Sequence, residues 1–240
     1  MPRLPFTHTR DSIYHVVLRS NRRQVLFDTA EDRRALNEAT TETLQRFDAT
    51  LHGYCLMPNQ FRALLQIEDR KLVKALKGIV SRYARHREES LASNVALFER
   101  PFDARRVETT DEFLRLLRRI HLSPFLANEV VDLDDYLWSS HRAYLGFDTV
   151  AQITTEFGLA LFATDVVQAR GEYGKFIAAG LATATTDDES GESGQFAVGD
   201  LPMIATTGEL LRDRLNVRKT KSRRGGREPK HPTRRYLSIY

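Results

Sequence analysis

The sequence predicts an α+β fold, in which an antiparallel sheet carries helices on one face. Three observations predict it: runs rich in β-branched and aromatic residues, longer segments whose apolar residues recur every three or four positions, and the alternation of the two types. In chain order they give the pattern β-α-β-β-α-β, which is the ferredoxin-like arrangement. A helical extension and a basic tail are expected beyond it.

The first four elements come from the N-terminal part of the chain. Ser12–Ser20 is rich in β-branched and aromatic residues, as strands are. Thr29–Phe47 is predicted to be a helix, because acidic residues fall in its first turn. Residues 49–57 and 61–67 are two further strands with a Pro-Asn turn signal between them. We therefore expect these two strands to pair as a hairpin.

The next elements complete the predicted sheet. Ala104–Glu108 is the fourth strand, and Thr109–Leu122 is a helix with a threonine cap and Pro124 just beyond its end. The aromatic-rich segment Asp135–Gly146 is expected to close the core. Before them, Asp69–Leu91 is predicted to be a long helix, because apolar residues recur along one face. Those residues are Leu72, Val73, Leu76, Ile79, Val80 and Tyr83.

The composition suits a soluble globular protein with a core, since hydrophobic residues make up 41% and charged residues 28% of the chain. The single cysteine, Cys55, cannot form an internal disulfide and indicates a reducing compartment. The sequence contains no apolar run long enough to span a membrane and no signal-peptide pattern at its start. We expect a cytoplasmic protein without a membrane partner.

The positive charge is concentrated at the C-terminal end. Residues 212–240 hold eleven Lys and Arg against two acids, a net charge of +9 within a chain of +4, so the rest carries −5. A basic tail on an acidic body indicates a polyanion partner, most often nucleic acid, and a solvated tail is the alternative. The expected phosphate contacts are Arg19, Arg22 and Arg23 after the first strand, and Arg218, Lys219, Lys221, Arg223, Arg224 and Arg227 in the tail.

Four parts are expected along the chain: a ferredoxin-like domain over 1–147, a helical extension over 148–182, a flexible linker over 183–197 and a basic segment over 198–240. The linker is predicted from its polar, acidic and Gly/Ser-rich composition. The basic segment contains two stretches compatible with short helices, so a small helical DNA-binding unit is one interpretation of it.

The hairpin turn is followed by two polar residues, Gln60 and Arg62, separated by one apolar residue. Side chains two positions apart in a strand point to the same face, so Gln60 and Arg62 project together and Phe61 projects to the other side.

Five motifs in order resemble the REP-associated tyrosine transposases, within the insertion-sequence single-tyrosine HUH transposases. They cover roughly the first two thirds of the chain. The motifs are "YHVVLRSNRRQVLF", "LHGYCLMPNQFRALLQ", "SRYARH", "RRIHLSP" and "DYLWSSHRAYLG". The resemblance implies a DNA partner, in the form of single-stranded hairpins or palindromic repeats, and it is compatible with a homodimer.

The resemblance also implies a catalytic site. In the family, two histidines at the positions of Gln60 and Arg62 hold Mg²⁺ or Mn²⁺, which polarises a DNA phosphate. A tyrosine on the long helix attacks that phosphate, and its match here is Tyr83. On periodicity alone, Tyr83 is instead a core residue of its helix. The helix also departs from the family about one turn later, at Arg87 and Glu88.

The replacement of both histidines predicts that the metal site is lost. Gln60 offers one amide oxygen, but the Arg62 guanidinium has only donors and brings a positive charge. We expect no metal and no cofactor, and a DNA-binding protein impaired in strand cleavage. Two alternatives are open. One is an active enzyme that uses Tyr83, with Arg62 in place of the metal charge or with a new metal site at His52, His86 or His121. The other is a regulatory or protein-interaction module on the same fold.

Overall fold

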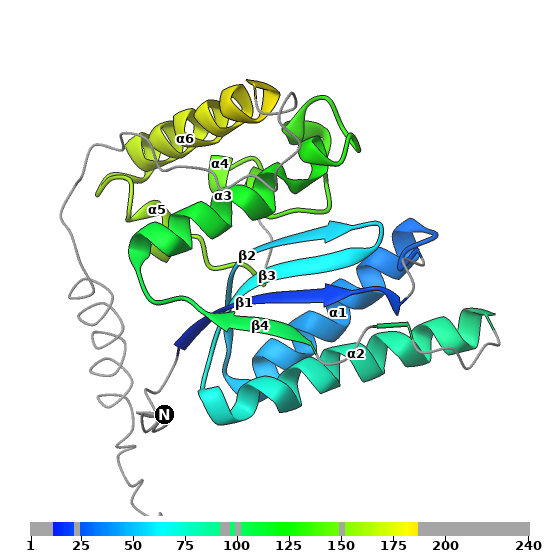
Figure 1. Cartoon of the computed structure of the whole chain (residues 1–240). Helices are drawn as coiled ribbons and strands as arrows, with labels where there is room; N and C mark the ends of the chain where they lie inside the picture. The colour runs from blue at the N-terminus through cyan, green and yellow to red at the C-terminus, as the bar shows by residue number, and fades with distance from the viewer. Residues whose placement is uncertain (1–11, 22–24, 92–96, 99–101, 149–151, 187–240) are drawn as a thin grey trace, which may run out of the picture. The chain divides into compact units, whose positions relative to one another are not determined.

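The structure, a computed structural model, describes residues 12–21, 25–91, 97–98, 102–148 and 152–186 (Figure 1). The chain divides into two compact units, Met1–Ile204 and Ala205–Tyr240, and every described residue belongs to the first. The strands are β1 (Ser12–Arg19), β2 (Thr50–Met57), β3 (Gln60–Ile67) and β4 (Asp103–Arg106). The helices are α1 (Ala30–Phe47), α2 (Asp69–Leu91), α3 (Thr110–Leu126), the 3-10 turn η2 (Leu133–Asp135), α4 (His141–Leu145), α5 (Glu156–Leu159) and α6 (Val166–Thr186).

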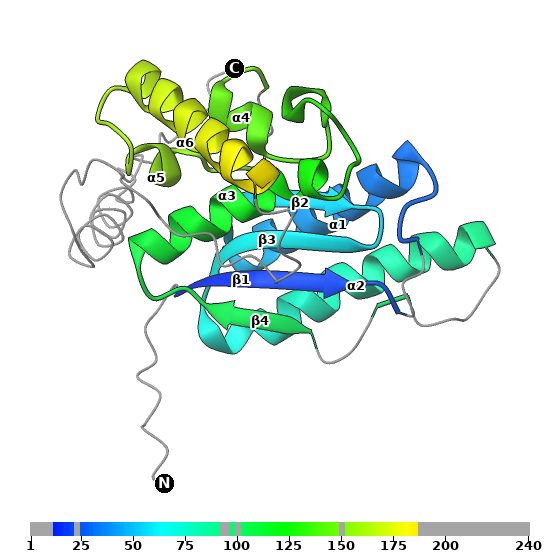
Figure 2. The same cartoon turned by 45° about the horizontal axis from the view of Figure 1, so that its top comes forward.

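The four strands form one antiparallel sheet in the order β2-β3-β1-β4. Helices α1 and α2 lie along one face of this sheet, and α3 crosses the other face with α4, α5 and α6 stacked beyond it (Figures 1 and 2). The predicted ferredoxin-like α+β fold is confirmed. The second helical layer was not predicted, because the predicted ferredoxin-like pattern has helices on one face of the sheet only.

The main core lies between the sheet and helices α1 and α2. Alternate residues of β3 point into it, from Phe61 to Ile67, and they meet the apolar stripe of α2. Tyr83 belongs to this stripe and is fully buried, as its helical periodicity predicts. The residues between, Gln60, Arg62, Leu64 and Gln66, therefore point to the face on which α3 lies.

A bulge in β2 lets α3 pack closely on that second face. The pairing with β3 shifts between Leu51 and Gly53, which leaves His52 as the extra residue. A Cβ atom at Gly53 would lie 2.7 Å from the Leu117 side chain of α3. Glycine suits this position because a side chain here would force the Leu117 side chain to move.

A chain of buried hydrogen bonds ties the second layer together. His121 Nε2 lies 2.7 Å from Ser140 Oγ, and its Nδ1 lies 2.8 Å from the Tyr173 hydroxyl. That hydroxyl lies 2.6 Å from Nδ1 of His141. Burial lowers the pKa of His121 well below its ordinary value, and the nearby His141 lowers it further. His121 is therefore a neutral packing residue that joins α3 to α6.

Three element boundaries differ from the predictions by two residues or more, and several others differ by one residue. Helix α3 continues through Pro124 to Leu126, because a proline within the last turn disturbs few backbone hydrogen bonds. Strand β4 covers Asp103–Arg106, slightly before the predicted range. Helix α6 continues to Thr186 and so enters the stretch predicted as a linker from residue 183. None of the described helices has the length and apolar character needed to cross a membrane.

Candidate functional site

Gln60 and Arg62 are the first and third residues of β3, directly after the hairpin turn. Both are half-buried and face the α3 side of the sheet, whereas Phe61 is buried in the core with α2. Pairing with β1 places Arg19 beside Gln60 and Val17 beside Arg62. Strand β2 places the buried thiol of Cys55 on the other flank of Arg62.

Strand β4 extends the same face, because it pairs with β1. Asp103 lies opposite Val17, and Arg105 lies opposite His15. Helix α3 packs on the β2 and β3 half of the sheet, so β1 and β4 lie beside it rather than beneath it (Figure 2). We call this surface the Arg62 face. It consists of His15, Arg19, Gln60, Arg62, Asp103 and Arg105 on the sheet and Arg119 on α3.

The Arg62 face has an excess of positive charge. Burial lowers the pKa of the Arg62 guanidinium, and the charges of Arg119 and Arg19 lower it further. Burial and the Arg62 charge likewise lower the pKa of His15 to about 4, so this imidazole is neutral at pH 7. Asp103 is the carboxylate within this set, and it lies 3.3 Å from Arg19 and 3.9 Å from Arg105.

Two polar atoms at the centre of this face lack a partner. Nε of Arg62 and Nε2 of His15 are buried and make no hydrogen bond within the described structure. A buried polar group without a partner costs stability, and a partly buried charge without one costs more. The arrangement is therefore suited to an external acceptor such as an anion.

The side chains of this face do not fit a divalent metal ion. Arg62 has no lone pair to offer, and its charge would repel a cation beside Gln60. Asp103, the nearby carboxylate, already pairs with two arginines. Within the described residues no group of three His, Cys, Asp or Glu could hold a metal ion.

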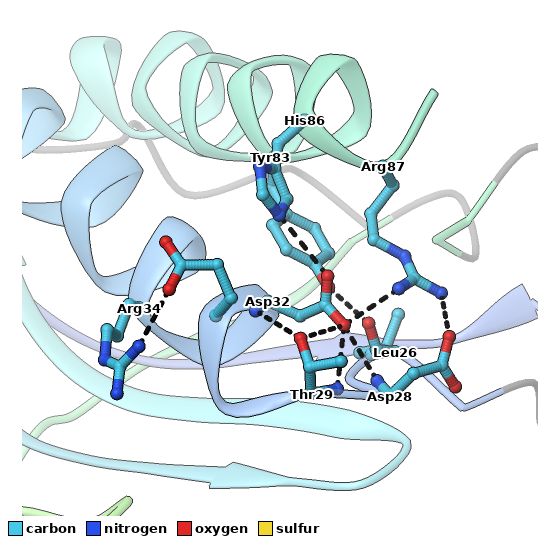
Figure 3. A network of polar contacts seen from close by, with 9 residues as sticks. Leu26, Asp28, Thr29, Asp32, Arg34, Tyr83, His86 and Arg87 are labelled. Atoms are coloured by element: carbon cyan, nitrogen blue, oxygen red, sulfur yellow. Dashed lines mark hydrogen bonds and ion pairs between the residues drawn. The ribbon is translucent and has the colours of Figure 1, made fainter. Parts of the chain in front are cut away.

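Tyr83 does not share a site with Gln60 and Arg62. Its side chain is fully buried between the sheet and α2, on the face opposite Arg62, and its hydroxyl donates to the Leu26 carbonyl oxygen (Figure 3). Burial raises the pKa of this hydroxyl well above its ordinary value, and the nearby Asp32 raises it further. A nucleophile must be accessible and easily deprotonated, so this placement argues against the expectation that Tyr83 attacks a phosphate held by Arg62.

We predict that Tyr83→Phe acts on stability and leaves DNA binding unchanged. The Leu26 carbonyl would lose a buried donor, which lowers the free energy of unfolding by about 1–3 kcal/mol. Urea denaturation and DNA titration of the same preparation measure both effects. A covalent protein–DNA product that forms with Mn²⁺ in the natural protein and disappears in Tyr83→Phe would contradict this structural role.

An ion network surrounds Tyr83 at the N-terminus of α1 (Figure 3). Arg87 of α2 donates to Asp32 at 2.9 Å and to Asp28 at 2.6 Å. Asp32 also accepts from the backbone nitrogens of Asp28 and Thr29, both at 2.9 Å, and so completes a capping box with Thr29. Arg87, at the departure from the family pattern, therefore joins α2 to the start of α1.

The three histidines considered for another metal site do not meet. His86 lies on α2 and contacts Asp32 at 3.3 Å, on the core side of the sheet. His52 lies on the opposite face, with Nε2 2.8 Å from Gln66 Oε1. His121 is held by Ser140 and Tyr173. Each imidazole has its own polar contact within the protein.

Sequence reasoning missed His15, Asp103, Arg105 and Arg119. His15 could have been recognised. Its neighbours Tyr14 and Val16 are core residues of β1, so His15 points to the opposite face of the sheet, which is the face of Arg62. Arg119 could not have been recognised, since its place depends on how α3 crosses the sheet. Of the other predicted phosphate contacts, Arg19 is exposed at the end of β1. Arg22, Arg23, Arg218, Lys219, Lys221, Arg223, Arg224 and Arg227 lie outside the described residues.

The sheet order β2-β3-β1-β4 defines a ferredoxin-like domain. Residues 8–115 match the family model described as "Transposase IS200 like". This match supports the resemblance to the IS200-like transposases that the sequence motifs predict.

A solved structure described as a REP-associated tyrosine transposase bound to a REP hairpin has the same fold. It superposes with a TM-score of 0.51, at 11% identity, over 64% of this chain and 98% of that one. A second crystal structure, of a candidate transposase from Deinococcus radiodurans R1, has a TM-score of 0.36 at 15% identity, over 55% of this chain and 100% of that one. Comparison with curated proteins gave no match.

Proposed function

We propose that this protein binds DNA through the phosphate backbone at the Arg62 face and does not cleave it by metal-dependent chemistry. The observation that carries the proposal is the half-buried Arg62 guanidinium, which forms no salt bridge with a described carboxylate and lies near the charges of Arg19 and Arg119. A planar guanidinium binds two phosphate oxygens through parallel hydrogen bonds.

Three further features support the proposal. The family is one of DNA transposases, and a protein of the same fold was solved with a REP hairpin. Arg19, Arg105 and Arg119 add positive charge around Arg62, which attracts a polyanion. We therefore propose a single-stranded hairpin or palindromic repeat as the DNA ligand. We also propose that the protein acts in the cytoplasm. There Cys55 would remain a free thiol.

The proposed loss of cleavage follows from the side chains at the Arg62 face and from the position of Tyr83. A scissile phosphate at Arg62 would have a guanidinium to bind its oxygens but no ion to polarise it. Tyr83 lies across the sheet from it and is buried. Binding without strand cleavage is the chemistry that remains.

We predict that Arg62→Ala weakens binding of a single-stranded hairpin about tenfold or more, the loss expected when a hydrogen-bonded charge pair is removed. Fluorescence anisotropy over a series of salt concentrations measures it. The log–log salt slope should flatten by about 0.7–0.9, as for one phosphate contact.

The matched control is Arg85→Ala, which removes the same charge from an exposed position of α2 on the other side of the sheet. Its affinity should stay close to that of the natural protein. If the two variants weaken binding equally, the DNA does not contact the Arg62 face. A Mn²⁺-dependent cleavage product would contradict the proposed loss of activity.

A further inference from the structure

The charge balance of the Arg62 face leaves two arginines without a carboxylate. Asp103 pairs with Arg19 and Arg105, at 3.3 and 3.9 Å. Arg62 and Arg119 form no salt bridge with any described residue. They lie close enough for the Arg119 charge to lower the pKa of Arg62. Two positive charges without a salt bridge therefore lie near each other where α3 packs on β3.

Near these two arginines the carboxylate among the described residues is Asp103, which already pairs with Arg19 and Arg105. The Cys55 thiol beside Arg62 is fully buried, and its burial raises its pKa, so it stays uncharged. His15 is neutral at pH 7 and keeps a buried nitrogen without a partner. A partly buried cation is normally paired with an anion, so the missing counter-charge is expected from a ligand.

The number of charges and oxygens distinguishes two kinds of phosphate. An internal phosphodiester of a nucleic acid carries one negative charge and two free oxygens. A phosphate monoester carries close to two negative charges at neutral pH and three free oxygens. Two guanidinium forks can bind three oxygens with only one oxygen shared between them, whereas with two oxygens both would have to be shared.

The position of the two arginines also suits a chain end. Arg62 is half-buried and Arg119 is exposed, so one forms the inner part of the site and the other its outer part. A terminal phosphate has one bulky substituent and can approach end-on, with its three oxygens leading. An internal phosphate has a sugar on each side, which holds it farther from the half-buried Arg62.

We propose that Arg62 and Arg119 form a binding site for a phosphate monoester, namely the terminal phosphate of a nucleic-acid strand. This rests on the proposed function, since the strand is the source of the monoester, and it adds to that function a preference for strand ends over internal positions.

The test compares two hairpins of identical sequence, one with a 5′-phosphate and one with a 5′-hydroxyl, binding to the full chain in fluorescence anisotropy at one salt concentration. The phosphorylated hairpin should bind about tenfold more tightly, which corresponds to one charge-assisted contact. Arg119→Gln should abolish this difference. Arg85→Gln, which removes an exposed arginine on α2, should preserve it.

A third hairpin with a 3′-phosphate and a competition with inorganic phosphate separate the sources of the monoester. Inorganic phosphate at millimolar concentration should weaken binding of the phosphorylated hairpin more than binding of the hydroxyl hairpin, and so reduce the difference between them. An equal preference for 3′-phosphate would assign the site to either strand end and would still support a monoester site.

Equal binding of the 5′-phosphate and 5′-hydroxyl hairpins, with Arg62→Ala still weakening both, would overturn this inference and leave the proposed function intact. Failure to bind either hairpin at low salt would overturn both. A 5′-phosphate preference that survives in Arg119→Gln would also overturn the two-arginine site.

Discussion

Asp32→Ala lowers the free energy of unfolding by about 3–5 kcal/mol, the loss expected when one partner of a buried ion pair is removed. Asp32 is 3% exposed and Arg87 is 5% exposed, so the guanidinium that remains loses its buried partner and keeps only the exposed Asp28. The substitution also removes the acceptor for the backbone nitrogens of Asp28 and Thr29 at the start of α1. Urea denaturation followed by circular dichroism measures the change.

The matched control is Glu31→Ala, one residue earlier on the same helix. Glu31 is exposed and pairs with Arg34 on the surface, so its removal should cost less than about 1 kcal/mol. A double variant, Asp32→Asn with Arg87→Met, should cost less than the sum of its single changes, because the two residues contact each other directly. Equal effects of Asp32→Ala and Glu31→Ala would contradict the structural role of the pair.

The same pair makes stability sensitive to acid. Burial alone would raise the pKa of Asp32, but hydrogen bonds from the Thr29 backbone and from Arg87 outweigh it and hold that pKa below its ordinary value. A carboxyl whose pKa is depressed by folding stabilises the protein above its unfolded pKa of about 4, and this contribution disappears as the pH falls through the folded pKa. Arg87→Met removes a cause of this depression, so the free energy of unfolding of the variant should fall less than that of the natural protein as the pH drops below about 4.

Local patterns were sufficient to predict the sheet and its main helices. The Pro-Asn turn gave the β2–β3 hairpin, and the apolar spacing of α2 placed Tyr83 in the core. The same spacing argued against Tyr83 as a nucleophile, and its buried position agrees with the periodicity rather than with the family role. The alternation of β3 was likewise sufficient to place Gln60 and Arg62 on one face.

Contacts between distant parts of the chain were beyond local patterns. The pairing of Asp32 with Arg87 depends on how α1 and α2 lie against each other, and neither residue has a sequence neighbour that signals the other. The approach of Arg119 to Arg62 depends on the bulge at His52 and on Gly53, which set the path of α3. The sequence therefore predicted that the residues at the two metal-binding positions had changed. It did not predict that Arg119 would lie near Arg62.

Deletion of residues 212–240 should have the largest effect on DNA affinity, because it removes a net charge of +9. We propose that this basic tail contacts DNA phosphates without regard to sequence. Each phosphate that it neutralises on a single strand contributes about 0.7 to the log–log salt slope, so the deletion should flatten the slope by up to about six. Anisotropy titrations from low to moderate salt measure both the slope and the affinity.

A variant of full length in which the eleven Lys and Arg residues of this segment are replaced by Gln separates charge from chain length. It should behave like the deletion, because counterion release depends on charge. The ratio of affinities for a hairpin and an unstructured strand should be unchanged in both variants, since a sequence-blind tail binds the two alike and discrimination would come from the Arg62 face. A salt slope that stays the same after deletion would show that the tail does not contact DNA, and the Arg62 face would then account for binding alone.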